Sequence, residues 1–100
     1  METDEKYNGW TNYETWAVNL WIGNEEASYS YWSEQALAAK ALPEDSAYGN
    51  RTASITLQQQ LKEEITDEAP DLGCTLYADL LGAALSSVNW SEIADGLLEE

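Results

Sequence analysis

Apolar residues recur every three or four positions along most of this chain, which is the spacing of amphipathic helices. The first run predicts a helix at about residues 12–22, with Trp16 and Trp21 on its apolar face. Thr11 and Glu14 fit a capping box at its start, and a Gly-Asn pair is typical of its end. The chain therefore opens on a helix whose start and stop signals agree with its periodicity.

A second helix is expected to follow at once and to end before Pro43. Asn24 can cap it, and Glu25 and Glu26 lie in its first turn, where carboxylates meet the positive end of the helix dipole. Its predicted inward stripe consists of Tyr29, Trp32, Ala36 and Ala39.

Turn-forming residues dominate positions 43–52, which predicts the longest loop. A third helix is expected at about residues 53–67, and three residues at four-residue intervals would form its apolar face: Leu57, Leu61 and Ile65. Residues 53–57 are also the one stretch that could form a strand. Helix is the favoured of these two alternatives.

Pro70 and Gly73 interrupt the chain before two more expected helices. The fourth spans about residues 74–86, and its wide apolar face consists of Leu76, Leu80, Leu81, Ala84 and Leu85. The fifth is short, begins near Trp90 and is capped by Asn89 or Ser91. Its inward residues are expected to be Ile93, Ala94, Leu97 and Leu98.

No segment alternates apolar and polar residues for long enough to predict a sheet. The predicted fold class is therefore all-α: residues 1–100 form one acidic domain, a compact bundle of about five short helices. Hydrophobic residues make up 44% of the chain and include five tryptophans and six tyrosines, so a packed core is expected rather than disorder.

Cysteine content and the first ten residues bear on the compartment. Cys74 is the only cysteine, which excludes an internal disulfide. Residues 1–10 lack the basic and apolar regions of a signal peptide, and no apolar run approaches the roughly 18 residues of a membrane span. We expect a cytoplasmic protein with no membrane partner.

The sequence contains few residues that are suited to catalysis. The chain has no histidine, which removes the imidazole base, the histidine metal ligand and histidine-assisted nucleophiles. The glycines are too scattered for a phosphate-binding loop, and no calcium-loop pattern occurs. Adjacent carboxylates could serve a hydrolase, but they lie on predicted helix surfaces and in loops. Cys74 lacks a neighbouring base and is expected to be a packing residue. We expect no enzyme, no cofactor and no metal.

Three segments resemble parts of a known family. Residues 7–16, Tyr-Asn-Gly-Trp-Thr-Asn-Tyr-Glu-Thr-Trp, resemble the signature of a family of small proteins encoded by phages and other mobile elements. Residues 78–81 and 89–94 resemble that family's C-terminal part. The resemblance implies a small phage protein acting in a bacterial host, where acidic proteins of this size are often anti-CRISPR or anti-restriction factors that imitate DNA. It transfers no functional residue.

The aromatic residues of this segment have a structural interpretation. Trp10, Tyr13, Trp16 and Trp21 are expected to build the core and to brace the N-terminal loop. If Trp10 or Tyr7 is exposed, it becomes a candidate anchor for a partner, because aromatic residues are over-represented at binding hot spots.

The net charge of the chain further limits the range of possible functions. Nineteen carboxylates against four basic side chains give a formal net charge of −15. On a folded body roughly 30 Å across, this approaches the density of duplex DNA, which carries one charge per roughly 1.7 Å. Nucleic acid and anionic membranes would repel such a surface, which leaves basic proteins as partners. We therefore expect a phage-encoded inhibitor, an anti-CRISPR above all, that acts as an acidic DNA mimic.

The expected partner is the basic DNA-binding surface of a host defence protein, either a CRISPR effector, including its PAM-reading region, or a restriction enzyme. The inhibitor would act in the cytoplasm of the bacterial host as a monomer or weak homodimer, without binding nucleic acid directly. The carboxylates predicted to form the contact surface fall into two groups, Glu25, Glu26, Glu34, Glu44 and Asp45, and Glu63, Glu64, Asp67, Glu68 and Asp71.

Two other functions remain open. A phage accessory module could bind a host or phage protein through a Trp/Tyr surface, with its acidity incidental. A structural virion component would instead assemble with itself at high concentration. Binding through charge should weaken as salt rises, whereas binding through aromatic side chains should barely respond to salt.

Overall fold

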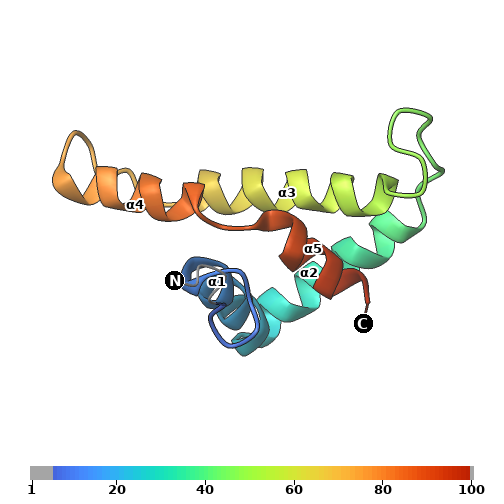
Figure 1. The fold of residues 1–100 in the computed structure, drawn as a ribbon, viewed down its shortest axis with the longest axis horizontal. Helices are drawn as coiled ribbons and strands as arrows, with labels where there is room; N and C mark the ends of the chain where they lie inside the picture. The colour runs from blue at the N-terminus through green and yellow to red at the C-terminus, as the bar shows by residue number, and fades with distance from the viewer. Residues whose placement is uncertain (1–5, 100) are drawn as a thin grey trace.

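The chain folds into five helices, shown in Figure 1 for the computed structural model, which describes residues 6–99. In chain order they are α1 (Tyr13–Asn24), α2 (Glu26–Lys40), α3 (Thr52–Glu68), α4 (Leu76–Ser86) and α5 (Trp90–Leu98). Within the described part, β pairing is confined to two isolated bridges in turns. The predicted all-α fold is confirmed, and the alternative strand at 53–57 is wrong because those residues lie inside α3.

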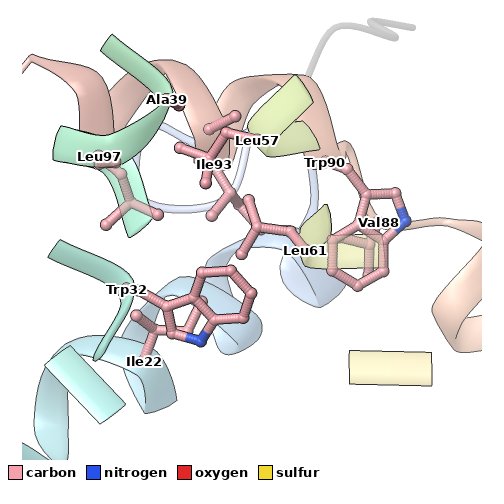
Figure 2. Close-up of a cluster of buried hydrophobic side chains, with 11 residues drawn as sticks. Ile22, Trp32, Ala39, Leu57, Leu61, Val88, Trp90, Ile93 and Leu97 are labelled. Atoms are coloured by element: carbon pink, nitrogen blue, oxygen red, sulfur yellow. The ribbon is translucent and has the colours of Figure 1, made fainter. Parts of the chain in front are cut away.

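The core is enclosed by α1, α2, α3 and α5, and α5 packs on each of the other three. Leu57 and Leu61 of α3 and Ile93 of α5 have no exposed surface. In Figure 2, Trp32 of α2 and Trp90 of α5 flank Leu61. Burial of a large aliphatic side chain contributes about 1.5–3 kcal/mol. The predicted inward faces of α3 and α5 are therefore confirmed where they meet.

Capping differs from the prediction at two helices. Asn12, and not Thr11, caps α1, because its Oδ1 accepts the backbone N–H of Thr15 at 2.9 Å. The predicted cap Asn24 is the last residue of α1, so Glu25 takes the cap position of α2 and makes no capping hydrogen bond through its side chain. The expected cap of α5, Asn89, is confirmed, since its Oδ1 accepts the N–H of Glu92 at 3.2 Å.

A polar network joins the start of α1 to the start of α5. The buried Thr15 hydroxyl donates to Asn12 Oδ1 at 2.6 Å and accepts the backbone N–H of Asn89 at 2.8 Å. Thr11 donates its N–H to Glu92 Oε1 at 3.0 Å, and its hydroxyl accepts Asn89 Nδ2 at 3.0 Å. These residues belong to two stretches singled out from the sequence, residues 7–16 and 89–94. Their role in this structure is to fasten two distant parts of the chain together.

The aromatic residues near the N-terminus divide between the core and the surface. Trp10 lies partly buried against the core, and Trp16 packs on Tyr7 with 4.9 Å between ring centroids. Tyr13 is 54% exposed and Trp21 is 67% exposed, so the expectation that both build the core is wrong. Tyr13 and Trp21 therefore lie on the side of α1 that faces solvent.

Helix α4 stands apart from the bundle. None of its residues is buried, and it touches the other helices only marginally. Leu76, Tyr77 and Leu80 are 58–67% exposed, so the predicted inward face is wrong at Leu76 and Leu80. The second half of α4 borders α3, whereas its first half lies at one end of the 43 Å long axis in Figure 1, where no helix packs on it.

Candidate functional site: an acidic and aromatic groove

A groove lies between the C-terminal ends of α1 and α3 and the N-terminal half of α2. It consists of two adjoining hollows of about 340 and 460 Å³, which share Glu25, Ser28, Trp32 and Glu68. We call it the acidic-aromatic groove and define it by the six side chains that give it its chemistry: Trp21, Glu25, Tyr31, Trp32, Glu64 and Glu68.

Two tryptophans form the apolar part of this groove. Trp32 is buried in the core and lines both hollows, whereas Trp21 lines the first hollow from α1 and remains open to solvent. Tryptophan buries 150–250 Å² in a typical core or interface. An indole so open beside a hollow is therefore a surface on which a partner can gain contact area.

A hydrogen-bond network holds one carboxylate of the groove in place. Tyr31 donates its hydroxyl to Glu64 Oε1 at 2.7 Å, and Gln60 donates its amide to Glu64 Oε2 at 2.9 Å. The same Gln60 amide donates to Gln35 Oε1 at 2.8 Å, which ties the network to α2. A carboxylate accepts at about four lone-pair sites, so Glu64 keeps capacity for another donor.

The hydrogen bond to the Glu64 carboxylate raises the pKa of the Tyr31 phenol above its ordinary value of 10.0. Desolvation and the negative charge of Glu64 act in the same direction. The shift reflects the strength of the contact that holds the Glu64 carboxylate, in which the protonated phenol is the donor.

Two of the three helix ends at the groove add to its negative potential; at the third, the N-terminal end of α2, Glu25 meets the positive end of the dipole. A helix C-terminus carries the equivalent of about half a negative charge, which basic residues in the last turn usually offset. Neither α1 nor α3 has a basic residue in its last turn, and α3 carries Asp67 and Glu68 there. Within residues 6–99, no ion pair neutralises Glu25, Glu64 or Glu68. The arrangement favours a cation supplied by a partner.

Glu25 and Glu26 also have a structural explanation. Both lie at the N-terminal end of α2, where negative side chains stabilise a helix. Glu68 has no such explanation, because a carboxylate at the end of α3 opposes the dipole. Among these carboxylates, Glu68 is the one whose position costs stability.

The other predicted contact residues lie outside the acidic-aromatic groove. Glu63 and Asp67 line a neighbouring hollow on α3, beside Lys62. Asp71 follows in the loop before α4, where its Oδ1 accepts the N–H of Gly73 at 3.0 Å. Glu34 is exposed in the middle of α2.

Two predicted contact residues lie far from the groove. Glu44 and Asp45 belong to the loop at the opposite end of α3, at the right of Figure 1. Asp45 Oδ1 accepts the N–H of Ala47 at 2.8 Å and so stabilises that turn. The ten carboxylates therefore do not form one continuous surface, and the densest group surrounds the end of α3.

The overall charge density is lower than the sequence suggests. A duplex as long as the 43 Å axis of the molecule would carry about 25 charges, against the formal charge of −15 here. Any likeness to DNA therefore depends on local groups such as those around the groove.

Cys74 is an exposed free thiol in the loop before α4, so the expectation that it packs in the core is wrong. Its segment leads into the first half of α4, where Leu76, Tyr77 and Leu80 are exposed. Among residues 6–99, no three acidic or thiol side chains are placed to share a metal ion. In the same range, no helix has both the length and the apolar character needed to cross a bilayer.

Sequence reasoning missed the two aromatic members of the site that face solvent. Trp21 has the helical spacing of a core residue, and Tyr31 lies two positions from Tyr29, the first residue of the predicted stripe. The position of Tyr31 off that stripe was the available signal that it faces another surface. Tyr29, placed on the stripe, is itself exposed.

One comparison with known proteins gives a result. A model described as a family of unknown function, DUF7249, matches residues 3–95. No curated protein and no solved structure matches the chain. The matched range contains α1 to α4 and most of α5, so the acidic-aromatic groove lies inside the region that defines the family.

Proposed function

Because the chain belongs to this family of unknown function, we propose a function from its own surface: it is a phage-encoded inhibitor that occupies the basic DNA-binding surface of a bacterial defence complex. CRISPR effectors and restriction enzymes are the candidate targets. The observation that carries the proposal is the group of unneutralised carboxylates around the end of α3, on a rigid helical body. The phage setting rests on the resemblance of residues 7–16 to proteins of mobile elements.

The charge supports a basic protein as partner rather than nucleic acid or a membrane. A surface with a formal charge of −15 is repelled by phosphates and by anionic lipids. Lysine and arginine residues that line a DNA channel would meet carboxylates where they normally meet phosphates. Such attraction accelerates association and is screened beyond about 8 Å at physiological ionic strength.

Competition with DNA tests this proposal. Candidate effectors and restriction enzymes are incubated with labelled target DNA, and fluorescence anisotropy reports bound DNA as the protein is added. We expect DNA to be displaced, and we expect direct binding of the protein to the effector, measured without DNA, to weaken as salt rises. Unchanged DNA binding across the candidate complexes would refute the proposal.

Charge reversals locate the contact. Glu63→Lys with Asp67→Lys changes the group at the end of α3 and leaves the hydrogen bonds of Glu64 in place. Glu34→Lys with Glu44→Lys alters the net charge by the same amount at other positions. We expect the first pair to reduce displacement of DNA far more than the second. Equal effects of the two pairs would mean that the net charge, and not the group at the end of α3, determines binding.

A second function is favoured by a different observation. Leu76, Tyr77 and Leu80 leave an apolar face open on α4, which suits an accessory module that binds a host or phage protein. Under this alternative, Tyr77→Ala with Leu80→Ala abolishes binding, the reversals at Glu63 and Asp67 do not, and affinity barely changes with salt.

A further inference from the structure

We propose that the acidic-aromatic groove binds one arginine side chain of the basic partner, with its guanidinium on the indole face of Trp21 and its N–H groups on the carboxylates of Glu25 and Glu68. This inference rests on the proposed function and names the group that the site recognises. The residues come from α1, from the junction between α1 and α2, and from the end of α3, so the site exists only in the folded protein.

The groove excludes most other occupants. An anion would meet the carboxylates of Glu25 and Glu68 and the C-terminal ends of α1 and α3. A purely apolar side chain would cover the indole but would desolvate those carboxylates without bonding to them. The occupant must therefore offer both an apolar or π face and several N–H donors.

Arginine meets both requirements better than lysine does. Its planar guanidinium stacks on aromatic faces and presents five donors in a fork that matches carboxylate geometry. The lysine ammonium is compact and strongly hydrated and has no flat face to lay on the indole, so it gains less from this site. The first hollow, of about 340 Å³, joins the indole of Trp21 to both carboxylates.

The carboxylate of Glu64, which is held in place, adds to the preference of the groove for a cation. Tyr31 and Gln60 hold Glu64 at the edge of the adjoining hollow, which also contains Glu25 and Glu68. A guanidinium on Trp21 therefore lies in a field set by three carboxylates from two helices. Preorganised acceptors of this kind bind more tightly because less conformational freedom is lost on binding.

Titration of three peptides tests the inference on the isolated protein. They are acetyl-(Gly-Arg)₅-amide and the same peptide with lysine or with citrulline in place of arginine. Isothermal titration calorimetry at physiological salt gives each Kd. We expect the arginine peptide to bind about fivefold or more tightly than the lysine peptide, given the magnitude of cation–π pairs, and the uncharged citrulline peptide not to bind.

Variants assign the binding to the groove. Trp21→Ala should weaken the arginine peptide roughly 2- to 30-fold and remove its advantage over lysine. Glu68→Gln should weaken both charged peptides. Tyr77→Ala removes an equally exposed aromatic side chain outside the groove and should change nothing. Circular dichroism and Tm establish that each variant is folded, as expected for exposed positions.

Equal affinity for arginine and lysine, or equal effects of Trp21→Ala and Tyr77→Ala, would overturn the inference. It can also fail while the proposed function holds: Trp21→Ala would then displace DNA from a defence complex as well as the wild type does. Conversely, arginine selectivity that depends on Trp21 would support the groove even if no tested complex released its DNA.

Discussion

Replacement of Thr15 by valine tests the network that joins α1 to α5. The substitution keeps the shape of the side chain and removes only the hydroxyl, which lies at a fully buried residue. That hydroxyl is the acceptor for the backbone N–H of Asn89 at 2.8 Å. Asn12 Oδ1 loses the hydroxyl as a donor but still accepts the N–H of Thr15 at 2.9 Å. One partly buried donor, the N–H of Asn89, is therefore left without its partner.

An unsatisfied buried donor costs about 1–3 kcal/mol. For a domain of this size, 1 kcal/mol lowers Tm by roughly 4–8 °C. We therefore expect Thr15→Val to lower Tm by roughly 5–20 °C, as measured by thermal unfolding followed by circular dichroism, with urea unfolding to give the free energy directly.

Thr56→Val is the matched control, because Thr56 is half-buried in the first half of α3 and makes no hydrogen bond through its side chain among residues 6–99. It should change the free energy of unfolding by less than about 0.5 kcal/mol. If Thr15→Val were as stable as this control, the network would not hold the two segments together, and the structural explanation of residues 7–16 would be wrong.

Three further predictions concern the groove and the core. The pKa of Tyr31 is higher in the folded than in the unfolded chain, so its hydrogen bond stabilises the fold below pH 10, and this stabilisation is lost as pH rises through the folded pKa. In absorbance titrations at alkaline pH, Tyr31→Phe should remove the tyrosine component that ionises last. Glu64→Gln should lower the pKa of that component. Glu68→Gln should raise the free energy of unfolding by about 0.3–1 kcal/mol at low salt while weakening partner binding, because it relieves repulsion with the end of α3; a loss of stability would contradict this electrostatic account. Leu61→Ala should cost about 2–5 kcal/mol, and Leu80→Ala less than about 1 kcal/mol, in urea unfolding, since only Leu61 is buried; similar costs would mean that α4 packs on the bundle.

The helices could be predicted from periodicity, but their environments could not. Leu57 and Leu61 obey the helical repeat and are buried, and Leu76 and Leu80 obey it equally and are exposed. Periodicity identifies an apolar face but not whether another element packs on it. The first half of α4 extends beyond its neighbours, and only the arrangement of α3 and α4 in space reveals this.

The candidate site shows the same division. The carboxylates could be recognised from the sequence, and Glu64 and Glu68 were expected in the same group of contact residues. The groove was not, because Glu25 and Glu68 come from helices that meet only through tertiary packing. The cap of α1 was missed for a related reason: Thr11 is engaged by Asn89 and Glu92, which lie far along the chain.

The central place of α5 has a consequence for biosynthesis. This helix follows all the others along the chain, yet Ile93 and Ala94 fill the middle of the core. Before α5 is synthesised, the parts of α2 and α3 that pack on it have no cover. We therefore expect the core to close only after α5 has left the ribosome.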